Sequence, residues 1–123
     1  MKRIIIFLII VIVFTGCCKK KQIAFDREGW NFDTDAQAIP PLREFMTESL
    51  LHDVKIKGKT TKELIDLLGE PENGMGTPPN ILRYEISCKD QYDYILEIES
   101  LDFYFNKDSV IESWKFEEYE VDL

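Results

Sequence analysis

The sequence predicts an α+β domain in which two short helices pack on one face of a small three-stranded antiparallel meander. Three observations support this fold class. Apolar residues recur at helical spacing after Pro40-Pro41, residues 60–71 carry the start and stop signals of a second helix, and apolar and polar residues alternate from Leu82 onward. Two helices followed by three strands give one helical layer on an antiparallel sheet. A chain of 123 residues accommodates one such domain and not two.

The first expected helix covers residues 42–52. Pro40 and Pro41 end the preceding segment and suit the first turn of a helix, where a backbone N–H has no helical partner in any case. Apolar side chains then recur every three or four positions, with charged and polar residues between them, which is typical of an amphipathic helix. These apolar positions are Leu42, Phe45, Met46 and Leu50.

The second expected helix covers residues 61–68. Thr60 and Glu63 have the spacing of a capping box, in which each side chain accepts a hydrogen bond from the other residue's backbone N–H. Gly69 stands where the end of a helix favours a glycine, and Pro71 prevents the helix from continuing. The inner face is expected to carry Leu64, Ile65 and Leu68.

Three strands follow the helices. The inward positions of the first are expected to be Leu82, Tyr84, Ile86 and Cys88. Residues 94–105 continue the alternation, but the inward positions change from even to odd numbers, so we expect one extra residue at 99–101, as a β-bulge or a break in the strand. Residues 106–109 are expected to form a turn, and the last strand covers residues 110–119, ahead of an acidic tail.

The first seventeen residues have the three-part layout of a secretory signal. Basic residues stand at positions 2 and 3, an unbroken apolar run covers residues 4–14, and small residues precede Cys17. A helix over this run rises roughly 16 Å, about half of the ~30 Å hydrocarbon core of a bilayer. The run is therefore too short for a permanent transmembrane span.

The end of this segment, Phe14-Thr15-Gly16-Cys17, resembles the lipobox of bacterial lipoproteins, with Phe14 in place of the usual Leu. The resemblance implies cleavage between Gly16 and Cys17 and lipid attachment, through acyl chains such as palmitate, at the Cys17 thiol. Several acyl chains at about 0.8 kcal/mol per buried CH₂ make a stable membrane anchor. The alternative interpretation is a short buried or signal-anchor helix with an incidental cysteine.

The chain thus divides into a signal peptide at residues 1–16, a lipidated tether and aromatic arm at 17–39, and the α+β domain at 40–123. Loss of residues 1–16 removes two basic residues and moves the formal net charge from −8 to −10. The lysines at 19–21 are expected to lie over the membrane surface, where each adds about 1 kcal/mol of attraction to anionic headgroups. The arm is expected to pack loosely and irregularly on the domain, and its aromatic residues are Phe25, Trp30 and Phe32.

The cysteines after the lipobox leave two options open. A disulfide between Cys18 and Cys88 is compatible with a location outside the cytoplasm, and a second acylation at Cys18 is the other option; the sequence decides for neither. Cys88 alternates with the core positions of its strand and is expected to be a small buried side chain rather than a nucleophile.

Residues 56–71 resemble the signature of the SmpA/OmlA group, the BamE-like bacterial lipoproteins, which consists of a glycine, a short capped helix and Leu-Gly-x-Pro. An aromatic strand, a strand ending in Phe, a turn and a last strand with Val follow in the same order. The resemblance covers about residues 42–118, marks the chain as a divergent member, and implies a lipid anchor and a protein-binding role in envelope or outer-membrane assembly or maintenance. The same two-helix, three-strand unit also resembles the repeat of β-lactamase inhibitor proteins, so one scaffold serves several binding roles. The residues of this fold signature are Gly58, Thr60, Glu63, Leu68, Gly69 and Pro71.

Few residues suggest chemistry. An excess of 23 acidic over 15 basic residues disfavours a nucleic-acid binder, which needs a basic stripe to meet phosphates, and a single histidine excludes a histidine-based metal cluster. His52 ends the first helix, where an imidazolium suits the helix dipole, and Ser49 precedes it without the turn that activates a serine nucleophile. Gly74-Met75-Gly76 lies in a loop and lacks the strand–turn–helix context of a phosphate-binding loop.

Two groups of sheet residues carry open interpretations. Acidic residues around the second strand suggest a calcium site or, more simply, a solvated strand face, because they lack the spaced loop with a central glycine that calcium prefers. They are Asp90, Asp93, Glu97, Glu99 and Asp102. The aromatic residues are expected in the core or in cross-strand pairs, and an exposed subset would be the best candidate for a partner surface. They are Tyr84, Tyr92, Tyr94, Tyr104, Trp114 and Tyr119.

The sequence therefore predicts a non-enzymatic, membrane-anchored lipoprotein with no catalytic residue, cofactor or metal. Its monomeric domain would bind an unidentified envelope protein, and its acidic surface would favour a basic patch on that partner. The expected location is the outer membrane facing the periplasm, with the cell surface and the inner membrane as alternatives. The alternative function is an inhibitor or immunity-type protein that blocks a toxin or hydrolase.

Overall fold

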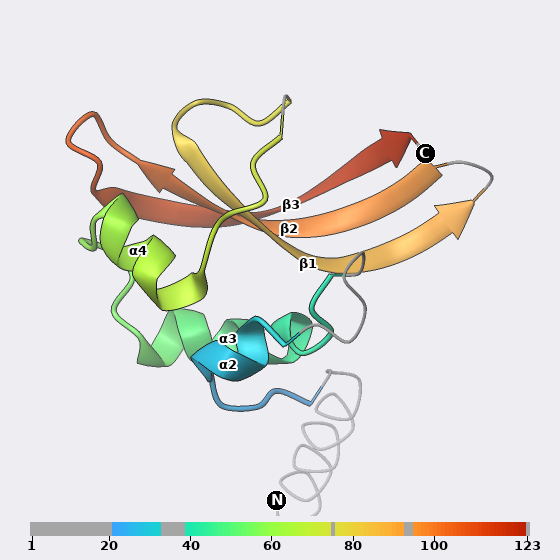
Figure 1. Cartoon of the computed structure of the whole chain (residues 1–123), viewed down its shortest axis with the longest axis horizontal. Coiled ribbons are helices and arrows are strands. Elements are labelled where there is room, and N and C mark those ends of the chain that lie inside the picture. The colour runs from blue at the N-terminus through green and yellow to red at the C-terminus, as the bar shows by residue number, and fades with distance from the viewer. Residues whose placement is uncertain (1–20, 33–38, 75, 93–94, 123) are drawn as a thin grey trace, which may run out of the picture.

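The computed structural model describes residues 21–32, 39–74, 76–92 and 95–122. Within these residues, three helices lie on one face of a three-stranded antiparallel sheet with the strand order β1-β2-β3 (Figure 1). The predicted α+β class and meander are confirmed, with one helix more than expected. None of the described helices is long and apolar enough to cross a membrane. The elements are α2 (Arg27–Trp30), α3 (Arg43–Asp53), α4 (Thr61–Leu68), β1 (Ile81–Tyr92), β2 (Ile95–Phe105) and β3 (Ile111–Asp122).

Helix α4 begins and ends where its flanking residues predict. The Thr60 hydroxyl oxygen accepts a hydrogen bond from the Glu63 N–H, and the Glu63 carboxylate accepts one from the Thr60 N–H, both at 3.2 Å. These bonds lower the pKa of the Glu63 carboxyl. Gly69 ends the helix with φ of 90° and ψ of −175°, a backbone conformation that is essentially restricted to glycine. Its N–H donates to the carbonyl oxygen of Ile65 at 2.7 Å.

Helix α3 starts one residue later than expected and buries polar side chains beside its apolar ones. Met46 and Leu50 are buried as predicted, and Arg43 and Thr47 are buried with them. The spacing of apolar residues alone therefore described only part of the inner face of this helix.

Arg43 joins four parts of the molecule. Its Nε donates to the Trp30 carbonyl oxygen at 3.1 Å, and its Nη1 donates to the Glu85 carbonyl oxygen at 2.9 Å and pairs with the Glu72 carboxylate. The guanidinium carbon lies 5.2 Å from the centre of the Trp30 ring and 5.9 Å from that of Tyr84. The buried charge thus has a counter-ion, two carbonyl acceptors and two aromatic faces, which together offset the cost of its burial.

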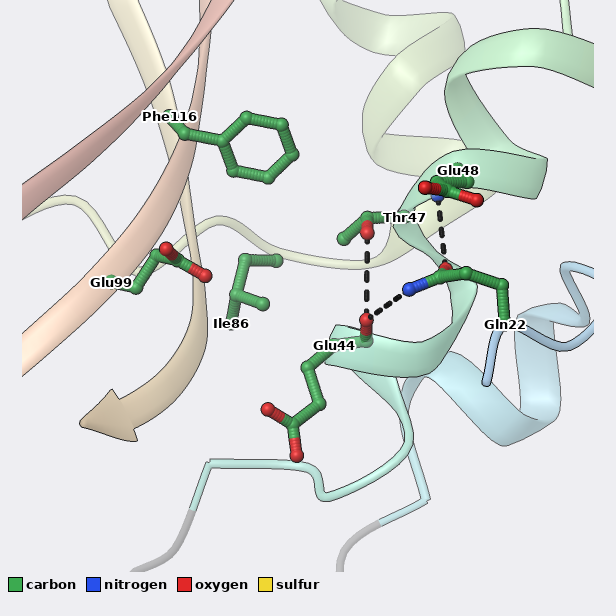
Figure 2. Close-up of a pocket in the computed structure, with 7 residues that line it drawn as sticks. All are labelled: Gln22, Glu44, Thr47, Glu48, Ile86, Glu99 and Phe116. Atoms are coloured by element: carbon green, nitrogen blue, oxygen red, sulfur yellow. Dashed lines mark hydrogen bonds between the residues drawn. The ribbon is translucent and has the colours of Figure 1, made fainter. Parts of the chain in front are cut away.

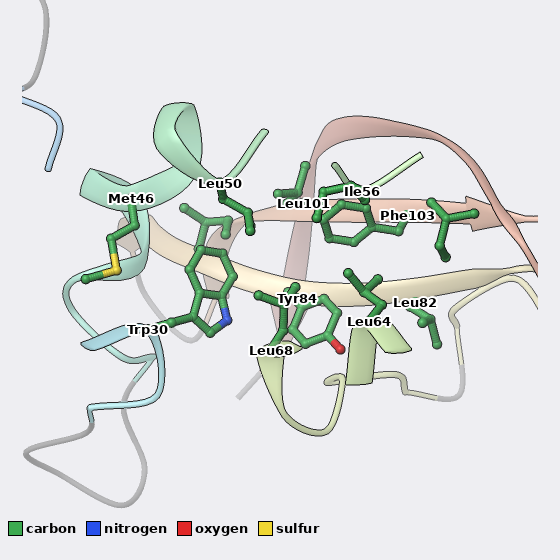
Figure 3. Close-up of a cluster of buried hydrophobic side chains, with 12 residues drawn as sticks. Trp30, Met46, Leu50, Ile56, Leu64, Leu68, Leu82, Tyr84, Leu101 and Phe103 are labelled. Atoms are coloured by element: carbon green, nitrogen blue, oxygen red, sulfur yellow. The ribbon is translucent and has the colours of Figure 1, made fainter. Parts of the chain in front are cut away.

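The centre of the core includes a residue of the arm (Figure 3). Trp30 is fully buried at the end of α2, a short helix capped by Asp26, whose carboxylate accepts from the Gly29 N–H at 3.1 Å. The Trp30 ring stands edge-on to Tyr84 at 6.4 Å between ring centres, and Tyr84 stands edge-on to Phe103 at 6.0 Å. The expectation of a loosely packed, irregular arm is therefore wrong for Trp30, because four residues form a helix too short to produce a periodic pattern.

The sheet has three register shifts, and none is an extra residue at 99–101 of β2. Two lie in β1, between Glu85 and Ser87 and between Cys88 and Asp90, and one lies where Tyr104 and Phe105 pair with β3. The first is a bulge in the middle of β1. Ile86 is the extra residue, since Glu85 pairs with Ser100 and Ser87 pairs with Glu99. Strand β2 pairs with β3 without a register shift from Ile95 to Tyr104, so the expected bulge at residues 99–101 is wrong. The parity change in β2 arises because both faces of this central strand are buried, and apolar residues occupy one face at position 98 and the other at positions 101 and 103.

The bulge also decides the side to which Cys88 points. Cys88 pairs with Ile98 on the face of the sheet away from the helices and is exposed. The expectation of a buried Cys88 is wrong for this reason. Its proposed disulfide partner, Cys18, lies outside the described residues, as do the cleavage and lipidation positions Gly16 and Cys17.

Candidate functional site

The helices cover only part of the sheet face on which they lie. An eleven-residue helix such as α3 is about 16 Å long, whereas a twelve-residue strand such as β3 extends about 40 Å. The strand ends away from α4 extend past the helices (Figure 1). Where the helical cover ends, side chains near the middle of the three strands face α3 across a groove of about 400 Å³, which we call the Phe116 groove (Figure 2). Its lining residues are Gln22, Glu44, Thr47, Glu48, Ile86, Glu99 and Phe116.

Three neighbouring strands supply one wall of the Phe116 groove. Ile86 comes from β1, Glu99 from β2 and Phe116 from β3, and the ring of Phe116 points toward α3 (Figure 2). Phe116 pairs with the fully buried Leu101, yet 44% of Phe116 is exposed. The two residues share a sheet face, so the difference in exposure arises because α3 and α4 do not extend over Phe116.

The opposite wall is built by α3 and by the residue that leads in from the tether. The Gln22 side chain donates to the Glu44 carbonyl oxygen at 3.1 Å and accepts from the Glu48 N–H at 3.2 Å. The neighbouring Ile23 N–H donates to the Phe45 carbonyl oxygen at 2.7 Å. These bonds fix the start of the described chain against α3, and they place it at the rim of the groove.

The charge around this apolar surface is negative. Glu44 and Glu48 stand on the helix side and Glu99 on the sheet side. Glu118 pairs with Glu99 across the β2–β3 ladder, and Glu120 pairs with Glu97, so these side chains share the face on which Phe116 lies. An aromatic ring surrounded by carboxylates favours a cationic or amphipathic ligand, because the ring face and the carboxylates both attract positive charge.

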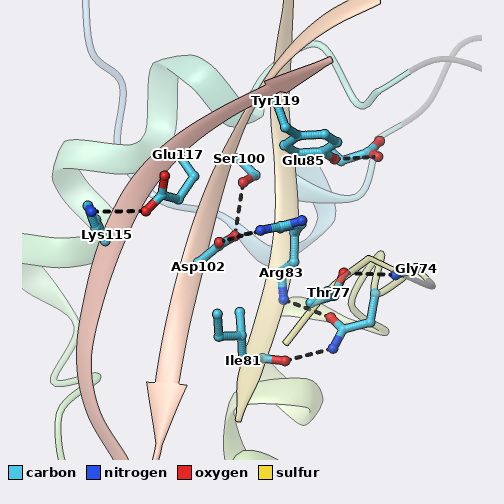
Figure 4. Close-up of polar contacts among 11 residues, drawn as sticks. Gly74, Thr77, Ile81, Arg83, Glu85, Ser100, Asp102, Lys115, Glu117 and Tyr119 are labelled. Carbon is cyan, nitrogen blue, oxygen red and sulfur yellow. Dashed lines mark hydrogen bonds and ion pairs between the residues drawn. The ribbon is translucent and has the colours of Figure 1, made fainter. Parts of the chain in front are cut away.

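A second cleft, of about 950 Å³, lies against the other face of the sheet, beside the loop at residues 74–77 (Figure 4). Arg83, Glu85 and Tyr119 line the cleft and belong to a polar cluster around Asp102. Asp102 is fully buried and accepts from Arg83 Nε at 3.0 Å, Arg83 Nη2 at 2.8 Å and the Ser100 hydroxyl at 2.9 Å. The Arg83 guanidinium carbon lies 4.7 Å from the centre of the Tyr119 ring, whose hydroxyl donates to Glu85 at 3.1 Å.

This cluster is suited to holding strands together and unsuited to moving protons. The hydrogen bond to Asp102 raises the pKa of Arg83, and burial together with the nearby Glu85 carboxylate raises the pKa of Tyr119. Both shifts keep these groups in their ordinary protonation state at neutral pH. The cluster links β1 to β2 through Arg83 and Asp102, and β1 to β3 through Glu85 and Tyr119.

The candidate residues at the end of α3 do not form a nucleophile–base pair. The Ser49 hydroxyl donates to the Asp53 carboxylate at 2.9 Å and accepts from the Phe25 N–H at 2.9 Å, while His52 Nδ1 lies 3.1 Å from the other Asp53 oxygen. Asp53 thus stands between serine and histidine, and these two neighbours lower its pKa. Ser49 serves to attach the arm to α3 through Phe25.

Those acidic residues of the calcium hypothesis whose side chains the structure describes do not gather. Glu97 and Glu99 lie on the helix-facing side of β2, and Asp102 lies on the opposite side in its ion pair with Arg83. No group of three or more potential metal ligands occurs among the residues that the structure describes. The side chain of Asp90 and the whole of Asp93 lie outside those residues.

The loop at residues 72–80 forms as expected between α4 and β1. Gly74 and Thr77 close a turn by two reciprocal bonds, from the Gly74 N–H to the Thr77 hydroxyl at 3.0 Å and from the Thr77 N–H to the Gly74 carbonyl at 3.1 Å. Met75 lies outside the described residues. The described residues of the turn, Gly74, Gly76 and Thr77, line the 950 Å³ cleft, and no helix that could hold a phosphate begins among them.

The fold-signature residues have structural roles. Gly58 has φ of 97°, and its N–H donates to the Ile111 carbonyl oxygen at 2.9 Å, which joins the α3–α4 link to β3. Leu68 is fully buried, and Pro71 follows the glycine that ends α4. None of the signature residues lines the Phe116 groove.

Comparison of the chain with protein families, with curated proteins and with solved structures finds no match. The likeness to the SmpA/OmlA group therefore stays a prediction from the quoted residues.

Sequence reasoning placed Phe116 in the last strand but did not single it out as exposed. The aromatic residues that it named for a partner surface lie elsewhere: Tyr84 is in the core, Trp114 packs against the core, and Tyr119 belongs to the polar cluster. The side chains of Tyr92 and Tyr94 are outside the described residues. The exposure of Phe116 could have been predicted from the difference in length between the short helices and the long strands. This difference leaves part of the sheet face without a helix above it.

Proposed function

We propose that this protein is a membrane-anchored, non-enzymatic protein-binding module of the bacterial cell envelope, with a role in envelope or outer-membrane assembly or maintenance. The observation that carries the proposal is the half-exposed Phe116 ring in a groove between α3 and the sheet. Exposed aromatic residues in such settings are frequent anchors of protein–protein interfaces.

The anchor position supports a function close to a membrane. Gln22 is five positions after Cys17, and a fully extended chain of five steps spans at most about 18 Å. Gln22 is bonded to α3 at the rim of the Phe116 groove. A lipid on Cys17 would therefore hold the groove within about 20 Å of the bilayer surface, where it meets membrane proteins at high effective concentration.

The polar clusters support a binding role over a catalytic one. Ser49, Asp53 and the Arg83–Asp102 pair are engaged in contacts that join structural elements, and none of them lines the Phe116 groove. The groove itself offers an aromatic ring, an aliphatic side chain and carboxylates, which suit recognition of a cationic or amphipathic segment.

The test is a crosslinking pull-down from membranes with the full-length chain, combined with intact-mass measurement. The variants are Phe116→Ser, Phe32→Ser and Cys17→Ala. Phe32 is the matched control, since it is 53% exposed and lies outside the groove. We expect a mass that lacks residues 1–16 and carries acyl groups, and one envelope protein captured by wild type and Phe32→Ser but at least tenfold less by Phe116→Ser.

Two results would contradict the proposal. Equal capture by Phe116→Ser would remove the groove as the binding site. A wild-type chain that keeps residues 1–16, or a Cys17→Ala variant that stays on membranes and captures the same protein, would remove the lipid anchor. A captured toxin or hydrolase that loses its activity at one-to-one stoichiometry would replace the envelope role with the inhibitor alternative.

A further inference from the structure

The two edges of the sheet differ in their accessibility. The edge of β1 is covered by the loop before it: the Glu72 N–H donates to the Arg83 carbonyl at 2.7 Å, and the Asn73 side chain bonds the Arg83 N–H at 2.8 Å and the Ile81 carbonyl at 2.6 Å. Arg43 covers the next carbonyl on this edge, that of Glu85. These contacts occupy the edge of β1 from Ile81 to Glu85, the half of the strand that follows the loop.

The edge of β3 is covered only at its start. Residues 58–60 pair with Val110 and Ile111, through the Gly58 N–H to the Ile111 carbonyl at 2.9 Å and the Ile111 N–H to the Lys59 carbonyl at 2.8 Å. Beyond this point no further strand lies beside β3 in the described part of the chain, because the sheet order ends at β3. We call residues 113–122 the open edge.

We propose that the open edge accepts an extended, basic segment of a partner protein as a fourth strand, with partner side chains entering the Phe116 groove. The inference rests on the proposed function and adds the conformation and charge of the bound segment. Strand addition supplies affinity through backbone hydrogen bonds, and alternate side chains supply specificity.

The charge of the open edge selects the partner. It carries Lys115 against four acidic residues, and Lys115 is paired with Glu117 at 3.1 Å. A second copy of β3 would bring these like charges against one another, which disfavours both a dimer through this edge and edge-to-edge aggregation. A segment with lysine or arginine at alternate positions would instead place opposite charges across the new ladder. The four acidic residues are Glu117, Glu118, Glu120 and Asp122.

The alternation of β3 connects the open edge to the groove. Phe116 shares a sheet face with Glu118 and Glu120, which are two and four residues further along the strand. A partner strand beside β3 would therefore place every second side chain on the Phe116 side. A long basic side chain there can lay its aliphatic stem on the ring and keep its charged end near the carboxylates.

The test uses the full-length protein in detergent and a synthetic eight-residue peptide of alternating Lys and Val as the probe. Binding is measured by fluorescence anisotropy, and amide hydrogen exchange is followed by NMR. We expect alternate amides between Ser113 and Asp122 to gain at least tenfold protection on peptide addition. Two further peptides test this directly, one N-methylated at the odd-numbered residues and one at the even-numbered residues. A strand bonds each neighbour through alternate N–H groups, so we expect one of these peptides to lose binding and the other to keep it.

Charge variants provide the second readout. Glu118→Gln with Glu120→Gln should weaken peptide binding about three- to tenfold, as expected for the loss of two partly exposed ion pairs. The matched control, Glu28→Gln with Glu70→Gln, removes two exposed carboxylates away from β3 and should leave the affinity unchanged. A peptide with Glu in place of Lys should not bind.

Several outcomes would overturn the inference. Peptide binding without new protection in β3 would show a side-chain contact in place of an added strand. Dimerisation of the protein through β3, seen by sedimentation, would assign the edge to a second copy. If the β3 amides stay unprotected with the peptide while Phe116→Ser still loses the envelope partner, strand addition is wrong and the proposed function stands. If Phe116→Ser keeps the partner but the peptide protects β3, the proposed groove function is the part that fails.

Discussion

The Arg43 guanidinium carbon lies 5.2 Å from the centre of the Trp30 ring, and its Nε donates to the carbonyl oxygen of the same tryptophan. One side chain of α3 therefore holds both the ring and the backbone of a residue thirteen positions earlier. This contact makes the segment around α2 part of the folded core.

Arg43→Met should lower the free energy of unfolding by about 3–5 kcal/mol. The variant keeps an apolar side chain of similar length but leaves the Glu72 carboxylate, already carrying one buried unpaired oxygen, without its counter-ion. Urea denaturation measures the loss, with the exposed Arg27→Met on α2 as the control. Equal stability of the two variants would show that Arg43 contributes little.

Glu72→Gln should change how stability depends on pH. Burial raises the pKa of Glu72 above its ordinary 4.5, although Arg43 acts in the opposite direction. A carboxyl that binds its proton more tightly in the folded chain contributes stability fully below 4.5 and loses that contribution as the pH rises through its folded pKa. Wild type should therefore lose stability relative to Glu72→Gln as the pH rises above 4.5.

Unfolding free energies at several pH values measure this difference. Glu70→Gln, at an exposed neighbouring position, serves as the control and should show no such trend. A difference that moves in wild type's favour with rising pH would mean that attraction to Arg43 outweighs burial.

Trp30→Ala should destabilise the protein by about 3–5 kcal/mol, because it removes the largest of the fully buried side chains. Phe32→Ala, two residues later and 53% exposed, should change stability by less than about 0.5 kcal/mol. Thermal or urea unfolding compares the two variants. Similar values for both would return the arm to the loose packing expected from its sequence.

Gly69→Ala should cost about 1–3 kcal/mol, because φ of 90° with ψ of −175° is strained for any residue with a Cβ. An added Cβ would also lie 3.0 Å from the Asn31 side-chain oxygen. Gly76→Ala is the control, since a Cβ there meets no atom within 4 Å. A neutral Gly69→Ala would indicate that the end of α4 can rearrange.

The parts of the fold that could be predicted are those with local causes. Helix α4 has its bounds fixed by Thr60, Glu63 and Gly69, whose hydrogen bonds and backbone angles act within a few residues. The three strands followed from alternation in the same way. The likeness of residues 14–17 to a lipobox concerns positions outside the residues that the structure describes.

The parts that could not be predicted depend on contacts between distant residues. Trp30 is buried because it contacts Arg43 of α3 and Tyr84 of β1. No sequence pattern near residue 30 predicts these contacts. In the sequence, the polar residues Ser100 and Asp102 interrupt the apolar alternation of the strand. They are buried beneath Arg83, and a buried polar residue cannot be told from an exposed one by its hydropathy. Phe116 had the pattern of a core residue, and its exposure follows only from where the helices end.

The bulge at Ile86 has a chemical consequence. Without this extra residue, the strict alternation from Tyr84 would direct Cys88 toward the helices, as the sequence suggests. With it, Ser87 and Cys88 are turned over, until a second register shift between Cys88 and Asp90 restores the original facing, and a sulfhydryl group comes to the solvent-facing side. Deletion of one isoleucine would thus be expected to withdraw a maleimide-reactive group from the surface without any change at the cysteine itself.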